Sequence, residues 1–302
     1  MYQIKPPGLS VCFLLTHEFT LTAYAAFLDV IRLAADKGVL GRQRNCRWRT
    51  LSVGRDRVMS SSGVELPCES YSPDPHGFDY IVVVGGVVRQ DSMLPIQDVA
   101  FLRAADAAGV TLVGLDSGSL LMQRAGLMEG ITHCAHWFDY LDYAGHGGDE
   151  PRTSSQIFLE DGKRITCAGG TSAADLAVWL VHRHMGERWA NKCQRMMIMS
   201  EVRAPTHPQP AIITPQTIRC PKLREAVHLI ELNIYERFST EDLAARVALS
   251  KRSLERKFRE ELGQGPQEFC MGLRLDLASK QLLTTDRAVT DVAYDCGFRN
   301  LG

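Results

Sequence analysis

The sequence predicts an α/β domain with a mostly parallel sheet sandwiched by helices, followed by a smaller all-α domain. Between residues 9 and about 170, short apolar strands alternate with amphipathic helices, the pattern of a helix-covered parallel sheet. Five prolines then interrupt residues 203–221, and every apolar pattern after residue 222 has helical spacing. The 302 residues also exceed the usual size of one hydrophobic core, so we expect two domains.

The first domain is expected to occupy residues 1–202. Its strands are predicted where apolar and β-branched residues cluster, and its helices where apolar residues recur at i, i+3 and i+4. In the first helix, for example, Phe27, Val30 and Ile31 share one face and Gly38 ends the pattern. The predicted strands are residues 9–15, 48–53, 80–84, 110–115 and 164–168. The predicted helices are residues 21–37, 98–108, 171–184 and 187–200.

The strand at 110–115 runs into a short stretch, Gly114-Leu-Asp-Ser-Gly118, that predicts a sharp turn into a helix. Many hydrolases hold a nucleophile on such a turn, called here the elbow, but this chain has Asp116. Its carboxylate could cap the following helix, pair with a cationic ligand in a pocket, or act as a nucleophile. Ser117 does not fit the Gly-x-Ser-x-Gly pattern of esterases. The residues alone leave these three alternatives open.

A ligand site is expected at this edge of the sheet, because ligands of open α/β sheets gather beyond the carboxyl ends of strands. A tryptophan face beside a carboxylate would suit an ammonium group through cation–π attraction, although Trp137 could equally be a core residue. The residues expected to line the site are Gly85, Gly86, Asp116, Ser117, His136, Trp137 and Thr171.

Composition excludes several classes of function. The 34 Lys and Arg nearly cancel the 35 Asp and Glu, so any site for a polyanion must be local. Nine cysteines without a Cys-x-x-Cys pair indicate free thiols in a reducing cytoplasm. The run from His133 to His136 lacks a second ligand pair, so neither a metal nor a cofactor is expected. No segment has the pattern of a secretory signal or the roughly 20 apolar residues of a membrane span, which predicts a cytoplasmic protein without a membrane partner.

The second domain, expected over residues 222–302 after a Pro-rich linker at 203–221, contains a predicted helix-turn-helix. Ser239 and Asp242 have the spacing of a capping box, and Ser250 is placed to begin the next helix. The pattern around Asp242 also returns 49 residues later at Asp291, which predicts two copies of one motif. The predicted helices are residues 222–238, 240–247, 250–262 and 266–283.

The helix at 250–262 carries its charges opposite an apolar seam. Arginine can bond guanine bidentately and glutamate can accept from cytosine, whereas lysine and further arginines suit phosphates. The alternative is that these charges only form a solvated helix face. It is disfavoured by the capped helix that precedes residue 250, by the short turn between the two helices and by the repeat. The predicted DNA contacts are Lys251, Arg252, Ser253, Glu255, Arg256 and Arg259.

Residues 222–302 resemble the DNA-binding domain of the AraC/XylS family of transcription regulators. The resemblance rests on Thr240-Glu-Asp-Leu-Ala-Ala245, on Leu249 to Phe258, on Gly263-Gln-Gly-Pro266 and on Val292-Ala-Tyr-Asp-Cys-Gly-Phe298. It implies that Arg252, Glu255 and Arg256 read bases. The given sequence ends at Gly302, where the family's second recognition helix would begin, so the second motif is expected to be incomplete and the chain as written to read half a site.

The first domain resembles the class I glutamine amidotransferase-like domain of the PfpI type, which has a flavodoxin-like parallel sheet. The residues that carry the resemblance are 80–86, the elbow with residues 125–130, 132–137 and 168–175. It implies that Asp116 stands at the position of the enzymes' nucleophilic cysteine, and that their acidic partner falls near Ala23. Both changes would remove groups that the enzymes use for catalysis.

Together these features predict a transcription regulator, not an enzyme, that binds double-stranded DNA and senses a small metabolite such as an amine or amino acid. The resemblance further implies a homodimer, with RNA polymerase as a possible partner. Two alternatives remain: a PfpI-like amidase or hydrolase fused to a DNA-binding module, and a first domain that serves only for dimerisation.

Overall fold

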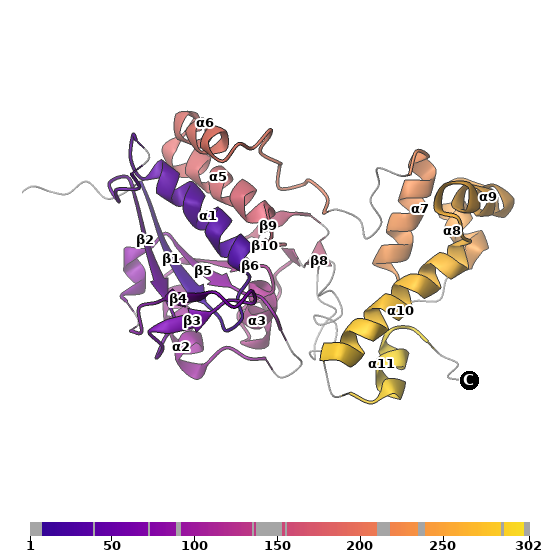
Figure 1. Ribbon diagram of the computed structural model, residues 1–302, viewed down its shortest axis with the longest axis horizontal. Helices are drawn as coiled ribbons and strands as arrows, with labels where there is room; N and C mark the ends of the chain where they lie inside the picture. The colour runs from indigo at the N-terminus through magenta and orange to yellow at the C-terminus, as the bar shows by residue number, and fades with distance from the viewer. Residues whose placement is uncertain are drawn as a thin grey trace, which may run out of the picture. The chain divides into compact units, whose positions relative to one another are not determined.

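The chain forms two compact units, Met1–Gln209 and Pro210–Gly302, which are coloured along the sequence in Figure 1. Residues 203–209 belong to the first unit by this division. The computed structural model describes residues 8–38, 40–71, 73–88, 92–134, 136, 153–154, 156–209, 218–234, 239–284 and 287–298.

A six-stranded sheet in the order β2-β1-β5-β6-β10-β9 forms the centre of the first unit. Its strands are β1 (Leu9–Leu15), β2 (Cys46–Leu51), β5 (Tyr80–Val84), β6 (Thr111–Leu115), β9 (Phe158–Asp161) and β10 (Arg164–Cys167). Five of them pair in parallel, with Phe13 opposite Val82 and Val82 opposite Val113. The predicted α/β class with a mostly parallel sheet is therefore confirmed. β9 was not predicted, and it pairs antiparallel with β10 across a tight turn in which Gly162 has φ 59°.

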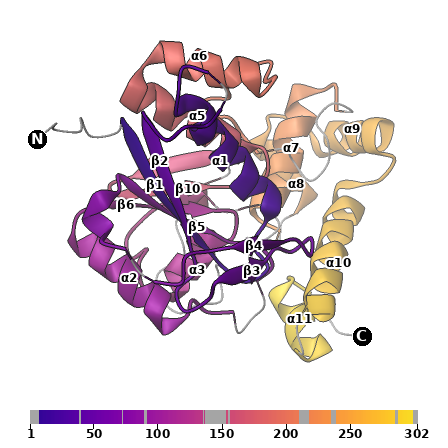
Figure 2. The same ribbon diagram turned by 60° about the vertical axis from the view of Figure 1, so that its left-hand side comes forward.

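Helices cover both faces of the sheet, because its strands carry apolar side chains on both sides. One face packs against α1 (Leu21–Ala34), α5 (Ser172–Met185) and α6 (Glu187–Met196). The other packs against α2 (Ile96–Ala107) and α3 (Gly118–Arg124). Figure 2 shows α2 on the opposite side of the sheet from α5 and α6. In β5, Val82 and Val84 belong to the first core and Ile81 and Val83 to the second.

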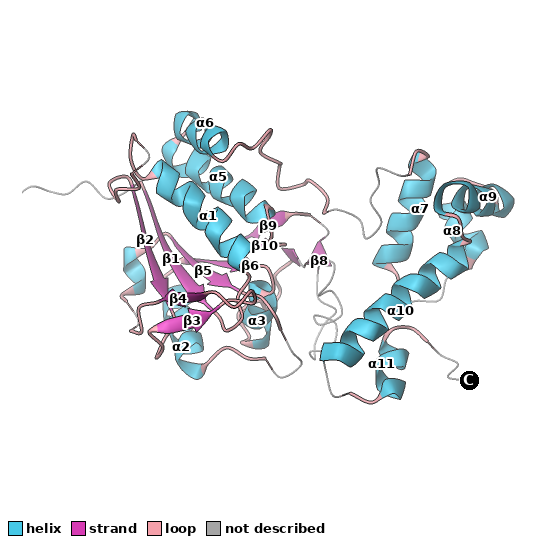
Figure 3. Cartoon of the chain, viewed as in Figure 1, coloured by secondary structure: helices cyan, strands magenta, loops and turns pink. Residues whose placement is uncertain are grey.

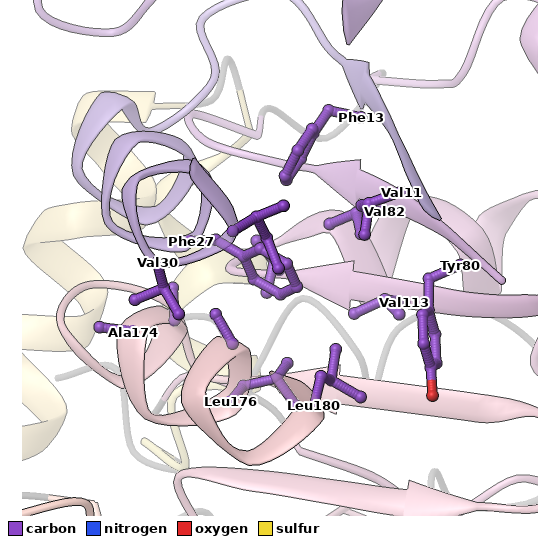
Figure 4. Close-up of a cluster of buried hydrophobic side chains, with 14 of the residues drawn as sticks. Val11, Phe13, Phe27, Val30, Tyr80, Val82, Val113, Ala174, Leu176 and Leu180 are labelled. Atoms are coloured by element: carbon purple, nitrogen blue, oxygen red, sulfur yellow. The ribbon is translucent and has the colours of Figure 1, made fainter. Parts of the chain in front are cut away.

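Aromatic rings fix the position of α1 on the sheet. Phe13 of β1 meets Tyr24 and Phe27 of α1 edge-to-face, with ring centroids 5.2 and 5.4 Å apart. Val30 on the same helix faces Ala174 and Leu176 of α5 in the core of Figure 4. Such aromatic pairs add about 0.5–1.5 kcal/mol each beyond the burial of their area. These contacts hold α1 against β1 and α5.

Two predicted helices end earlier than the sequence pattern suggested. α1 ends at Ala34 instead of residue 37, and the chain turns so that the Asn45 amide can donate to the carbonyl of Ala35. α6 ends at Met196 because Ile198 adopts φ 55°, which no helix continues. Short elements that were not predicted complete the unit: β3 (Arg57–Met59), β4 (Glu65–Pro67), the 3-10 turn η1 (Pro75–Gly77), β7 (His133–Cys134) and β8 (Thr153–Ser154).

The second unit is all-helical over its described residues, as Figure 3 shows. Its helices are α7 (Pro221–Leu232), α8 (Thr240–Arg246), α9 (Lys251–Leu262), α10 (Pro266–Thr284) and α11 (Val289–Asp295). Phe258 of α9 and Phe269 of α10 are buried with ring centroids 5.7 Å apart. α7 ends six residues before the predicted end, at Leu232, where the side-chain amide of Asn233 donates to the carbonyl of Leu229 at 2.8 Å.

Candidate functional site

The elbow between β6 and α3 has the strained geometry of a nucleophile-bearing turn. Asp116 adopts φ 58°, a left-handed conformation that costs a non-glycine residue about 1–3 kcal/mol. Its amide donates to the carbonyl of Cys167 at 3.0 Å, and its Oδ1 accepts from the amide of Ser117 at 2.8 Å. The turn is therefore held from both sides with an aspartate at its apex.

Glycines make the elbow possible by letting backbones meet. A Cβ atom on Gly85 would lie 2.2 Å from the amide nitrogen of Gly118, and one on Gly118 would lie 2.2 Å from the carbonyl oxygen of Val83. Gly86 likewise approaches the carbonyl of Glu18, with an added Cβ only 2.0 Å away. These contacts explain the Gly85-Gly86 pair through packing, because a side chain at Gly85 would push the elbow off the sheet and one at Gly86 would displace the backbone of Glu18 and Phe19.

Ser117 fastens the elbow to the turn after β5. Its hydroxyl donates to the carbonyl of Gly86 at 2.8 Å and accepts from the amide of the same residue at 2.9 Å. The side chain is buried, with 1% exposed. With its proton committed to a carbonyl, this hydroxyl serves as a structural clamp.

The second carboxylate oxygen of Asp116 points to the turn between β10 and α5. A Cβ atom on Gly169 would lie 2.6 Å from Oδ2, and Gly169 itself has φ 88°. Asp116 is half-buried, whereas Thr171, two residues beyond Gly169, is exposed. The structure therefore brings Gly85, Gly86, Asp116 and Ser117 together directly and places Thr171 at the end of the adjoining turn. His136 is half-buried, and Trp137 lies outside the described residues.

A buried thiol adjoins the elbow without being poised for reaction. The Cys167 side chain is fully buried and lies 3.2 Å from the hydroxyl of Ser172. Burial raises the pKa of the Cys167 thiol to about 11, and the hydrogen bond with Ser172 only partly opposes that rise. Because the thiolate is the nucleophilic form, the Cys167 thiol is not activated as a nucleophile.

Sequence reasoning missed two residues beside the site, Asp175 and Arg203. Asp175, in the first turn of α5, is 1% exposed and accepts from the backbone amide and the guanidinium of Arg203. The Arg203 guanidinium also donates to the Thr171 hydroxyl at 3.1 Å. An acidic residue inside the buried stripe of α5 was the available signal, because a buried carboxylate requires a partner.

In the second unit, α8 and α9 form the predicted helix-turn-helix with the predicted caps. Ser239 accepts from the amide of Asp242 at 3.0 Å, and Ser250 accepts from the amide of Ser253 at 3.2 Å. Between the helices Ala248 adopts φ 52°. This one left-handed residue redirects the chain so that α9 begins at Lys251.

The 49-residue repeat in the sequence is also a repeat in backbone geometry. α11 occupies Val289–Asp295, which is α8 shifted by 49 positions, and Gly297, with φ 83°, occupies the position of Ala248. The amides of Leu249 and Phe298 close the two turns with bonds of 2.9 Å to Ala244 and Ala293. The described residues thus contain one complete motif and the first helix and turn of a second.

The outer face of α9 is basic and accessible. Lys251, Arg252, Arg256 and Arg259 are exposed, Ser253 and Glu255 are half-buried, and Leu254 and Phe258 are buried on the opposite face. The Lys251 ammonium lies 2.5 Å from the Glu241 carboxylate of α8, and Arg256 lies 3.6 Å from Glu260. The hydrogen bond between Lys251 and Glu241 raises the pKa of Lys251 and lowers that of Glu241. This intramolecular partner of Lys251 was not anticipated.

Among the described residues, no group of three or more His, Cys, Asp or Glu side chains is arranged to hold a metal ion. None of the helices in the described part of the chain is long and apolar enough to cross a membrane.

Known proteins resemble both units. Residues 243–302 match the helix-turn-helix domain family. The HTH-type transcriptional regulator GbdR of Pseudomonas aeruginosa strain UCBPP-PA14 is 31% identical over 290 residues, which cover 96% of this chain and 78% of that protein. The HTH-type transcriptional regulator CdhR of P. aeruginosa PAO1 is 30% identical over 293 residues, covering 95% and 84%.

Solved structures also resemble this chain. An AraC family transcriptional regulator from Pseudomonas putida aligns with TM-score 0.54 and 25% identity, covering 63% of this chain and 99% of that one. A ThiJ/PfpI family protein from Pseudomonas syringae aligns with TM-score 0.53 and 17% identity, covering 74% and 86%, a likeness of fold. The helix-turn-helix, the two-unit architecture and these relatives lead to one conclusion. The chain belongs to the AraC family of DNA-binding transcription regulators, with a PfpI-like fold in its first unit.

Proposed function

We propose that this regulator is ligand-responsive: its first unit has lost the nucleophile of the PfpI-type enzymes and senses a small metabolite with a cationic nitrogen group. The observation that carries the proposal is Asp116, a carboxylate at the apex of a strained elbow where a catalytic thiol would stand. Backbone strain of this kind persists where the surrounding structure over-determines it, as at functional sites. Here the retained shape serves binding, and the site acts without catalysis.

The electrostatics of the elbow support a cationic group on the ligand. One oxygen of Asp116 is engaged by the Ser117 amide, and the half-buried carboxylate faces the β10–α5 turn. A charge-assisted hydrogen bond to such a group contributes about 1.5–3 kcal/mol. The candidate site is Gly85, Gly86, Asp116, Ser117 and Thr171, with His136 and Trp137 as further lining. Amines, amino acids and related nitrogen compounds fit this chemistry.

Sequence-specific DNA recognition is assigned to α9. Arg252, Glu255 and Arg256 are proposed to contact base edges in the major groove. Lys251, Ser253 and Arg259 are proposed to contact the phosphate backbone, which gives affinity without sequence information. The exposure of the basic residues on the face opposite Leu254 and Phe258 supports this assignment.

The proposed organisation is a sensor and dimerisation domain over residues 1–202, a Pro-rich linker over 203–221 and a DNA-binding domain over 222–302. Dimerisation would let two copies occupy the two half-sites of an operator. RNA polymerase is a further candidate partner at the promoter. A regulator of this kind acts where the DNA is, in the cytoplasm.

Thermal unfolding of the full chain against a panel of amines and amino acids tests the sensing function. A ligand present at a hundredfold its dissociation constant stabilises the protein by about 2.7 kcal/mol. Asp116→Asn is expected to weaken binding of that ligand by roughly 10- to 150-fold, the equivalent of about 1.5–3 kcal/mol. The control is Asp56→Asn, which makes the same change at an exposed position of the first unit.

Three outcomes would contradict the proposal. If no ligand in the panel stabilises the wild-type chain, or Asp116→Asn binds it as the wild type does, the assigned site is wrong. If the purified protein instead hydrolyses amides and Asp116→Asn abolishes the turnover, the first unit is an amidase fused to a DNA-binding module.

A further inference from the structure

The segment 203–209, called here the strap, is the last part of the first unit, and hydrogen bonds attach it to the rest of that unit. At its start, the Arg203 amide donates to Oδ1 of Asp175 at 2.9 Å, and the Arg203 Nε donates to Oδ2 at 2.9 Å. Asp175 is 1% exposed. Removing one partner of a buried ion pair leaves an uncompensated charge, so release of Arg203 carries a large local penalty.

The end of the strap has a second set of contacts. The carbonyl of His207 accepts from the amide of Ile157 at 2.9 Å, and Pro208 bridges to Gln156 in antiparallel fashion. The Gln209 side chain donates to the carbonyl of Gln156 at 3.0 Å. The strap is therefore attached at both ends before the chain continues toward the second unit.

Each attachment also involves a residue that bonds to the β10–α5 turn, which forms one side of the candidate site. Ile157 accepts from the amide of Ala168 at 2.9 Å, at the start of the β10–α5 turn, and Arg203 donates to Thr171 at its end. Between those two points, Gly169 is in contact with Asp116. Any ligand that moves this turn, or competes for the Thr171 hydroxyl, must act on the strap as well.

We infer that Arg203 is a positioning residue that couples the candidate site to DNA binding, by fixing the strap to Asp175 and Thr171 in one arrangement of the β10–α5 turn. The inference rests on the proposed sensing function and supplies its route of regulation. The strap is the first part of the chain that leads from the site to the second unit, and its anchor is a discrete contact that is either made or broken. Coupling between sites is reciprocal, so DNA bound by the second unit must change the affinity of the candidate site for its ligand by the same factor as the ligand changes the affinity for DNA, and the β10–α5 turn is where that change is expected.

This reciprocity allows a test without an identified ligand. Hydrogen–deuterium exchange of the full-length protein is measured with and without a duplex that the protein itself selects from a random pool. Adding the duplex is expected to change exchange in peptides covering residues 165–175 and 203–209 by about fivefold or more, the lower range of typical coupling. Arg203→Met is expected to abolish the change at 165–175, and Arg203→Lys, which keeps the charge without the fork, to leave part of it.

Controls separate coupling from loss of structure. Arg188→Met removes an exposed arginine from the same unit and should leave the response unchanged. If Arg203→Met unfolds the first unit, Arg203→Lys and Asp175→Asn carry the test, with exchange in β1 and β5 as the measure of an intact fold. The inference is overturned if wild-type protein shows no change at 165–175 on binding DNA, or if the change persists in Arg203→Met and Asp175→Asn.

The result is distinguishable from failure of the sensing function. If an amine or amino acid stabilises the wild-type chain through Asp116 while DNA leaves residues 165–175 unaffected, sensing stands and the strap does not transmit it. If DNA changes the turn through Arg203 while no panel ligand binds, the coupling stands and the proposed ligand class is wrong.

Discussion

The two left-handed turns of the repeat provide a quantitative test of how the helix-turn-helix is built. Ala248 and Gly297 are equivalent positions with φ 52° and 83°, yet one carries a Cβ and the other does not. The left-handed conformation costs an L-residue about 1–2 kcal/mol. Glycine avoids this cost, but its unfolded chain has more conformational entropy, which offsets about 0.5–1 kcal/mol of the gain. Ala248→Gly should therefore stabilise the second unit by about 0.5–1 kcal/mol, and Gly297→Ala should destabilise it by at least as much.

Amide exchange measures this effect within the full chain. In the limit where exchange follows local stability, a change of 1.4 kcal/mol alters the rate tenfold, so Ala248→Gly should slow exchange in the second unit by roughly two- to fivefold. All four tryptophans, at positions 48, 137, 179 and 189, belong to the first unit, so their fluorescence is an internal control that neither substitution should change. Faster exchange in Ala248→Gly, or no loss of protection in Gly297→Ala, would refute the argument that backbone strain sets the energy of these turns.

Three further predictions concern side chains of the second unit. Arg252→Ala should weaken binding to the selected duplex by about 1–3 kcal/mol and relax the base preference. Arg259→Ala should weaken binding to specific and random duplexes alike. Equal losses of affinity on both duplexes for Arg252→Ala would contradict base reading. Glu241→Gln frees Lys251 from its carboxylate partner and should tighten binding to all duplexes, with a salt slope steeper by up to about 1, and an unchanged slope would count against a phosphate contact by Lys251. Cys220 should be the first thiol alkylated by iodoacetamide as pH rises, which mass spectrometry can establish site by site. Burial raises the pKa of Cys220, but hydrogen bonds from the backbone amides of α7 and from the Lys257 ammonium together outweigh that effect and leave the pKa below its ordinary value.

The cysteine prediction has a clear physical basis in the other eight thiols. Burial raises the pKa of each of them, to about 12 for Cys12 and Cys46 and to about 11 for Cys167, Cys193 and Cys296. A thiol with a lowered pKa forms its thiolate at a lower pH, and the thiolate is the reactive form. Modification of another cysteine before Cys220 would contradict this order.

Local signals in the sequence were sufficient for much of the fold. The strand from Tyr80 to Val84 was predicted with its observed bounds, because a run of β-branched residues ending in Gly-Gly leaves little ambiguity. The caps at Ser239 and Ser250 were predicted because a hydroxyl at a helix start satisfies free amides within three residues. The ends of α1 and α6 were not, because both depend on backbone turns and carbonyl contacts that a hydrophobic period does not record.

The candidate site shows a similar division. Asp116 and Ser117 could be placed on one elbow, because the Gly-rich turn after a buried strand requires that geometry. The partners of Asp175 and Lys251 could not be predicted from the sequence. Arg203 follows Asp175 by 28 residues, and Glu241 precedes Lys251 by 10 residues on another helix. Such pairs depend on how elements pack in space. The Pro-rich composition around Arg203 predicted an extended linker but gave no sign of its contacts, and the structure holds residues 203–209 against the first unit.

The place of Cys220 at the start of α7 makes the native chain suitable for energy-transfer spectroscopy. All four indole donors lie in the first unit, and the one thiol with a lowered pKa begins the first helix of the second. A coumarin maleimide attached there would accept emission from tryptophan without removal of any other cysteine. Changes in transfer efficiency would then report movements between the units in solution as operator fragments are titrated.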